Sequence, residues 1–348
     1  MTHPRNLRPG RPTPLLLAAL LAALVVAPAS VRAQTSPNGS APEVSITEYA
    51  IPTPGSLPGG IVVGPDGAVW FYESGASQIG RITMDGSITE YPIPTPGASL
   101  ERQGFLAVGP DGALWFTENA ARRLGRITVD GSITDYPIPD AAAVPAPLTA
   151  GLPLGAVTGG PDGALWVTEG TARRLGRRAV DGTWQEIPLP HPDSPPLGLI
   201  VGPDQALWFT ETFPPNRIGR ATPDGQVAEY DLPTPDAGLL RLAVGPDGAV
   251  WFVEGKLHAI GRITTDGQIT EFAALDMAAG PGVTAGPDGA VWFTSFDGNR
   301  IERMTVDGQV TGYAVPTENS FPYHIVTGPD GALWFTEMDG NAIGRLAL

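Results

Sequence analysis

Glutamates at one repeated position are the first residues in this chain whose type and spacing could do chemistry. Each ends a short Trp-containing segment, and a ring of such carboxylates could hold a divalent cation through oxygen ligands. The six are Glu73, Glu118, Glu169, Glu211, Glu254 and Glu337. Ser295 stands at this position in one further copy, next to the copy that contains Glu337. Glu337 therefore faces a neighbour without a carboxylate, and we single it out as a candidate metal ligand.

A structural role competes with metal binding for the whole set. Every copy also has an arginine in the segment that follows, and Glu–Arg pairing along each hairpin, or to the next copy, would occupy most of the carboxylates. These arginines are Arg81, Arg126, Arg177, Arg220, Arg262, Arg303 and Arg345.

Histidines supply the second possible chemistry, since imidazole is the natural general base near neutral pH. His191 and His258 are predicted to lie in surface loops, whereas His324 opens the innermost strand of the last copy. The chain has no cysteine, no glycine-rich phosphate loop and no clear Ser-His-Asp set.

The repeat itself predicts the elements that position these side chains. Gly-Pro-Asp-Gly-Ala-Leu-Trp-Phe-Thr-Glu occupies residues 328–337, and near-copies begin at Gly64, Gly109, Gly160, Gly202, Gly245 and Gly286. Pro-Asp-Gly fits a tight turn, and the residues after it are rich in strand formers. Ile-Gly-Arg-Ile-Thr, an Asp-Gly turn and Ile-Thr-Glu-Tyr-Pro-Ile follow, so each unit is an antiparallel meander of four strands.

Seven such units predict an all-β fold, a seven-bladed β-propeller of four-stranded antiparallel blades. The repeated tryptophans are expected to pack between blades. The last copy ends without its fourth strand, and residues 44–54 closely copy residues 86–96. The amino-terminal strand should therefore complete blade seven and close the ring. We call the face at which the second strands end the upper face.

The first 43 residues differ from the repeats, which fill 44–348. Residues 1–33 combine early arginines, an apolar run and small residues, the pattern of a secretory signal peptide cleaved after Ala29 or Ala33. A polar linker follows at 34–43. We therefore expect a secreted or periplasmic monomer without a membrane span after cleavage. The formal net charge of −15 makes nucleic acid a poor partner, and a small molecule or peptide at the upper face of the channel is the expected ligand.

The repeated motifs resemble those of the streptogramin B (virginiamycin B) lyases over residues 44–348. The resemblance implies a seven-bladed propeller that opens cyclic depsipeptides at the ester by elimination and that needs Mg²⁺. In the mechanism it implies, a metal ion polarises the substrate carbonyl and a histidine takes the proton α to it.

The family's catalytic positions can be placed on blade seven. The closing acid is present as Glu337, but the histidine position holds Tyr323 and the earlier glutamate position holds Phe321. A second histidine position, one blade earlier, holds Pro281. His324 is displaced by one residue, so it should point away from the channel if Tyr323 faces it, unless a bulge shifts the register.

From this comparison we predict a site in which Tyr323 and His324 are catalytic, Glu337 and Glu318 bind Mg²⁺, and Ser295 and Phe321 contact substrate. Three functions stay open: a carbon–oxygen lyase acting on an ester or lactone, a binding propeller without catalysis, and a hydrolytic lactonase-like propeller.

Overall fold

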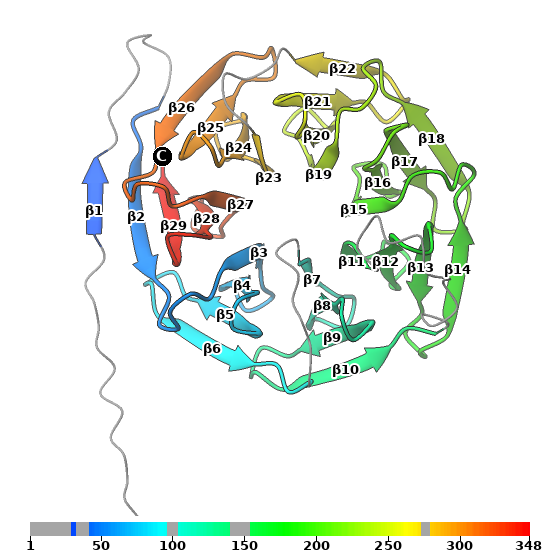
Figure 1. Cartoon of the computed structure of the whole chain (residues 1–348), viewed down its shortest axis with the longest axis horizontal. Coiled ribbons are helices and arrows are strands. Elements are labelled where there is room, and N and C mark those ends of the chain that lie inside the picture. Colours follow the sequence, from blue (N-terminus) through cyan, green and yellow to red (C-terminus); the bar gives the residue numbers. More distant parts are fainter. Residues whose placement is uncertain (1–28, 33–41, 96–103, 140–153, 273–278) are drawn as a thin grey trace, which may run out of the picture.

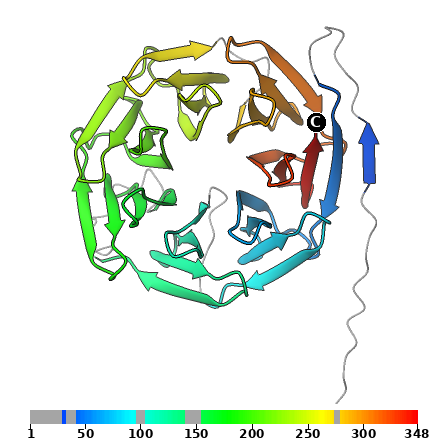
Figure 2. The ribbon, with the colours of Figure 1, turned by 180° about the vertical axis from the view of Figure 1, so that it is seen from behind.

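The computed structural model describes residues 29–32, 42–95, 104–139, 154–272 and 279–348. Figures 1 and 2 show seven four-stranded blades arranged as a ring around a central channel. The predicted all-β, seven-bladed propeller is confirmed. No helix in the described part of the chain is long and apolar enough to cross a membrane. Most of the predicted signal peptide and linker falls outside the described residues.

Each blade runs as a meander from the channel to the rim. The innermost strands are β3 (Pro58–Val63), β7 (Leu106–Val108), β11 (Val157–Gly159), β15 (Pro196–Val201), β19 (Leu239–Val244), β23 (Ala279–Ala285) and β27 (Pro322–Thr327). The second strands are β4 (Val69–Glu73), β8 (Leu114–Glu118), β12 (Leu165–Glu169), β16 (Leu207–Glu211), β20 (Val250–Glu254), β24 (Val291–Ser295) and β28 (Leu333–Glu337).

The outer half of each blade continues the same order. The third strands are β5 (Gln78–Ile82), β9 (Arg123–Ile127), β13 (Arg174–Arg178), β17 (Arg217–Ala221), β21 (Ala259–Ile263), β25 (Arg300–Met304) and β29 (Ala342–Ala347). The outermost strands are β6 (Ile88–Pro92), β10 (Ile133–Pro137), β14 (Trp184–Pro188), β18 (Val227–Asp231), β22 (Ile269–Phe272), β26 (Val310–Ala314) and, for blade seven, β2 (Ser45–Ala50).

Closure of the ring follows the sequence prediction. Strand β2 pairs antiparallel with β29, and the register joins Ser45 to Ala347 and Ala50 to Ala342. A further short strand, β1 (Ala29–Arg32), pairs with the outer edge of β2. The first and last strands of the propeller thus lie side by side in one sheet, which closes the ring at blade seven (Figure 1).

The core consists of apolar layers between neighbouring blades, with the repeated tryptophans in them as predicted. Trp70 of blade one packs with Leu114 and Phe116 of blade two, and its ring lies 5.6 Å from that of Tyr91 at an interplanar angle of 16°. Trp334 packs against blade one in the same manner. Burial of such large rings is the main stabilising contribution between blades.

The seven repeated third-strand arginines contact aspartates and not the second-strand glutamates, so the pairing predicted for them is wrong. Two other arginines, each at the start of a third strand, do pair with these glutamates: Arg174 with Glu169 at 2.9 Å and Arg217 with Glu211 at 3.2 Å. Arg81 lies opposite Trp70 on β4 and not opposite Glu73. It reaches the Pro-Asp-Gly turn, where its Nε donates to Asp66 Oδ2 at 2.7 Å, while Trp70 Nε1 donates to Asp66 Oδ1 at 3.0 Å. All seven blades repeat this Asp–Trp–Arg contact.

Candidate functional site

The repeated glutamates are buried inside the blades and do not form the predicted rim of the channel. Glu73 is fully buried, and its carboxylate lies over Gly80 on β5, where a Cβ atom would approach Oε1 to 2.6 Å. Burial raises the pKa of Glu73 to about 8, and the charge of Glu90 on β6 adds to the effect. In blade one, two carboxyl groups therefore meet across a glycine, an arrangement that favours one shared proton.

Blade six also places a carboxylate over a glycine, but the acidic residue and the glycine occupy different strands. Ser295 replaces the second-strand glutamate, Glu302 replaces the third-strand glycine, and Gly312 replaces the outer acid. A Cβ atom at Gly312 would lie 2.5 Å from Glu302 Oε2. The Glu302 carboxylate therefore occupies the space over this glycine, and the departures of Ser295 and Glu302 from the repeat belong to one local exchange.

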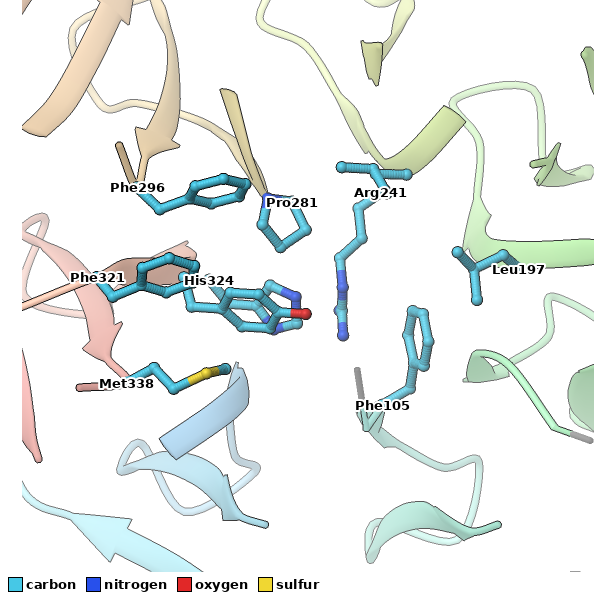
Figure 3. A pocket seen from close by; sticks show the side chains of 10 residues that line it. Phe105, Leu197, Arg241, Pro281, Phe296, Phe321, His324 and Met338 are labelled. Atoms are coloured by element: carbon cyan, nitrogen blue, oxygen red, sulfur yellow. The ribbon is translucent and has the colours of Figure 1, made fainter. Parts of the chain in front are cut away.

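A cavity of about 260 Å³ lies at the upper end of the channel (Figure 3). It is bordered by the starts of the innermost strands and by the residues that follow two second strands. Among the described residues, those that line it are Phe105, Leu197, Leu240, Arg241, Pro281, Phe296, Phe321, Tyr323, His324 and Met338. Apolar and aromatic side chains make most of the wall, and three polar groups converge within it: a guanidinium, a phenol and an imidazole.

Arg241 brings a positive charge into this cavity. It extends between Phe105 and His324 (Figure 3), with its guanidinium carbon 3.9 Å from the centroid of the Phe105 ring. Its Nη2 donates to the carbonyl oxygen of Gly104 at 3.1 Å. Within the described part of the chain Arg241 forms no ion pair, and burial lowers its pKa to about 9.

Tyr323 and His324 both line the cavity although they are adjacent in sequence. The pairing of β27 with β28 shifts register between Pro322 and Ile325, so the simple alternation of a strand does not apply. The backbone N–H of His324 donates to Thr336 Oγ1 at 3.1 Å. The bulge that is needed for both side chains to face the channel is therefore present, and it brings Tyr323 and His324 to the same side of the strand.

The His324 ring is held neutral. Burial lowers the pKa of His324 well below its usual value, the charge of Arg241 acts in the same direction, and a hydrogen bond to the Gly59 backbone opposes them. Its Nδ1 has no hydrogen-bond partner among the described residues. In the tautomer that carries its proton on Nε2, the Nδ1 lone pair can accept a hydrogen bond or a proton.

An aromatic wall closes one side of the cavity. The rings of Phe296 and Phe321 stack with centroids 4.7 Å apart at 12°, and the Phe321 ring lies 6.3 Å from that of Tyr323. Phe321 has a φ of 56°, which is uncommon for a bulky residue. The Met338 N–H donates to the Phe321 carbonyl oxygen at 3.1 Å. This contact fixes a strained backbone that places the Phe321 ring in the cavity.

The predicted site residues separate into two groups. Phe321, Tyr323 and His324 line the cavity, whereas Ser295, Glu318 and Glu337 do not. Glu318 is exposed on a loop. Glu337 is fully buried in blade seven beside Glu48, and the next residue, Met338, takes the place at the cavity wall.

The donor set for the predicted magnesium ion is not assembled at this cavity. No carboxylate is among the described lining residues, and nowhere in the described ranges do three or more Asp, Glu, His or Cys side chains gather in a metal-binding cluster. Mg²⁺ prefers oxygen ligands, carboxylates above all. Magnesium binding stays a prediction, and no chemical step is derived through it.

Arg241 was missed by the sequence analysis, although the repeat contains the signal. It stands four residues before the Gly-Pro-Asp-Gly motif, at the entrance of an innermost strand. The seven residues at this offset are Gly60, Phe105, Ala156, Gly198, Arg241, Gly282 and His324. Arg241 and His324 are the two with polar side chains, and comparing the repeats at this position would have selected both.

Comparison with known proteins agrees with the architecture. The Virginiamycin B lyase family model matches residues 40–155 and 152–348. The structure of a streptogramin B lyase is 37% identical over 88% of this chain and 98% of its own, with a TM-score of 0.78. Selenomethionine-substituted virginiamycin B lyase from Staphylococcus aureus is 38% identical over 88% of this chain and 100% of its own, also with a TM-score of 0.78.

Further comparisons add one more lyase structure and a propeller that is similar in fold only. A catalytically inactive variant of the Staphylococcus aureus enzyme, solved with quinupristin, is 37% identical over 88% of this chain and 100% of its own, with a TM-score of 0.77. A putative gluconolactonase, 19% identical over 69% of this chain and 86% of its own with a TM-score of 0.50, shares the fold alone. A search of curated proteins found no match. The family model and the two lyase structures together show that this chain belongs to the virginiamycin B lyase family.

Proposed function

We propose that the protein is a binding member of this family that holds a small, largely apolar ligand in the cavity at the upper end of the channel. The observation that carries the proposal is the lining: among its described residues, seven apolar or aromatic side chains surround three convergent polar groups. Ligand sites in proteins are mostly of this kind, with a few polar groups that fix orientation.

The replacements at the family positions favour binding over catalysis. Tyr323 stands where the resemblance puts a histidine base, and Phe321 stands where it puts a glutamate. Pro281 stands at the position of the second histidine. All three line the cavity. The cavity is therefore kept, while the groups associated with proton transfer and metal binding are exchanged for an aromatic and apolar wall.

A carbon–oxygen lyase is the second candidate, supported by family membership and by the lone pair of His324 Nδ1. In such an elimination His324 would accept the proton from the carbon α to a carbonyl. Arg241 would hold the carbonyl oxygen as negative charge develops on it. The carbon–oxygen bond to the ester breaks, a carbon–carbon double bond forms, and the ester leaves as a carboxylate. Nothing is added, so the linear product keeps the mass of the ring.

Mass spectrometry separates the candidates when the protein is incubated with quinupristin, with and without Mg²⁺. A linear product of unchanged mass, lost by at least about 100-fold in His324→Gln, identifies the lyase. A gain of one water identifies hydrolysis. Unchanged quinupristin, with saturable binding of a smaller ligand in calorimetry, supports the binding function. His258→Gln is the matched control, because His258 is exposed and does not line the cavity.

We also infer that the chain is exported and works as a monomer. The apolar run and small residues before Ala33 support export, and the propeller from β2 to β29 retains all seven blades after cleavage there. The intact mass of protein recovered from the periplasm or medium tests the cleavage position, and size-exclusion chromatography tests the monomer. Recovery of uncleaved chain from the cytoplasm contradicts export.

A further inference from the structure

We propose that the ligand of this cavity is a monocarboxylate with a flat apolar body, whose carboxylate is bound by Arg241. This inference rests on the proposed binding function and specifies its ligand class.

The first argument is the charge of Arg241. Its hydrogen bond and its ring contact are with neutral groups, the Gly104 carbonyl oxygen and the Phe105 ring, and the Tyr323 phenol lies close enough to raise the pKa of Arg241. By contrast, the repeated third-strand arginines all contact an aspartate. A cation that has lost much of its contact with water is stabilised by a nearby anion. The cavity next to Arg241 is the place where such an anion can enter.

The second argument is the geometry of the donors. A guanidinium has five N–H donors in a planar fork that matches a carboxylate in a bidentate contact. One of the Arg241 donors is used by Gly104 at 3.1 Å. The remaining N–H groups can donate hydrogen bonds to both oxygens of one carboxylate. Such hydrogen bonds are charge-assisted and stronger than hydrogen bonds between neutral groups.

The third argument limits the number of charges. Arg241 is the single arginine or lysine among the described lining residues, and the neighbouring imidazole of His324 is neutral. Apart from the neutral Tyr323 and His324 side chains, the described lining that a second carboxylate on the ligand would face is apolar. One anionic group is therefore favoured, and a dicarboxylate is disfavoured by desolvation of its second charge.

The fourth argument concerns the body of the ligand. The stacked pair Phe296 and Phe321 and the flexible side chain of Met338 offer a surface suited to an aromatic ring. A cavity of about 150 Å³ binds benzene, so 260 Å³ has room for a substituted ring and its carboxylate. A whole cyclic depsipeptide would remain largely outside.

Calorimetric titration with 3-phenylpropionate and indole-3-acetate tests this assignment. Each acid is compared with its primary amide, which has the same body without the charge, and with succinate as a dicarboxylate. We expect saturable binding of at least one of the two acids, and at least about tenfold weaker binding of its amide and of succinate. Arg241→Gln should weaken binding of the acid by at least about tenfold and leave the amide unchanged.

Two controls keep the result interpretable. Arg300→Gln removes an exposed arginine outside the cavity and therefore the same charge from the protein, so it should bind the acid as the wild type does. Circular dichroism checks that Arg241→Gln is folded, and Arg241→Lys should recover part of the affinity. If the amide and the acid bind equally well, and if each binds wild type and Arg241→Gln with the same affinity, the carboxylate assignment is overturned but the binding function is not. No binding of any probe overturns both.

Discussion

The rings of Tyr323 and His324, two consecutive residues, stack with centroids 4.6 Å apart at an interplanar angle of 30°. Consecutive residues of a regular strand point to opposite faces. Here the register shift between Pro322 and Ile325 turns both toward the channel. The bulge thus adds an imidazole to the position at which the family resemblance puts a single histidine.

His324 should remain neutral across the physiological pH range. Burial and then the charge of Arg241 hold the pKa of this imidazole well below its usual value. In nitrogen-detected NMR we expect the ring to stay neutral at pH values well below the ordinary histidine pKa of about 6.5. Arg241→Gln should raise the pKa of His324, because a repelling charge is removed. The NMR signal of the His324 ring is assigned by its loss in His324→Gln. A wild-type His324 ring that is half-protonated at about pH 6.5 would contradict the expected neutral state.

Glu337 should destabilise the propeller as the pH rises. Burial raises the pKa of Glu337 from 4.5 to about 9, and the charge of Glu48 contributes. The native state therefore favours the protonated carboxyl. Its stabilising contribution is complete below about pH 4.5 and is lost as the pH rises through about 9. Glu337→Gln mimics the neutral carboxyl and should be more stable than wild type by about 2 kcal/mol or more at pH 9.

Thermal or denaturant unfolding at about pH 5, 7 and 9 measures this difference. The gain from Glu337→Gln should grow with pH and be small near pH 5. Glu318→Gln is the control, since Glu318 is an exposed glutamate in the same blade. A gain that is independent of pH would point to a packing effect and not to the buried carboxyl.

Asp66 should stabilise blade one through two separate contacts. Burial pushes its pKa up, but the hydrogen bonds from Trp70 and Arg81 outweigh this effect and hold the pKa of Asp66 below its usual value. Asp66→Ala leaves the Trp70 indole N–H without its acceptor and should cost about 1–3 kcal/mol in denaturant unfolding. Asp66→Asn keeps one acceptor and should cost less. If Asp66→Ala and Asp66→Asn lower the unfolding free energy equally, the hydrogen bond to Trp70 contributes nothing to stability.

Ile46 on β2 should be critical to closure of the ring. It is fully buried in the core between blades six and seven, whereas the equivalent Ile88 on β6 is only partly buried. Ile46→Ala should cost about 2–5 kcal/mol in unfolding free energy, and Ile88→Ala should cost less. A smaller loss at Ile46 than at Ile88 would mean that β2 is not part of the cooperative fold.

The fold could be predicted from the sequence because every level of the signal is repeated. The Pro-Asp-Gly turn, the Trp-containing strand and the Asp-Gly hairpin recur together, and the copy at residues 44–54 indicated where the ring closes. Even the exception at Gln205, which replaces the turn glycine, keeps the turn by adopting a φ of 58°.

The site was predicted only in part, for physical reasons that differ between residues. Phe321, Tyr323 and His324 were found because a family motif could be aligned with them. That His324 shares a side with Tyr323 depends on a bulge, and the sequence does not encode bulges in a readable pattern. The pairing predicted between the repeated arginines and the second-strand glutamates was wrong because strand register, which sets Arg81 opposite Trp70, decides which charges can meet. Arg241 was missed because a lone arginine at a strand entrance resembles a surface residue.

Pairing of β2 with β29 also fixes the order in which the molecule can be completed during synthesis. Ser45 is among the first residues of the propeller to leave the ribosome, and its partner Ala347 belongs to the last strand of the propeller to be made. Until β29 has been synthesised, β2 has no partner strand in blade seven. A chain that lacks β29 therefore cannot close its ring by this pairing, so the ring is completed only after all seven blades have been made.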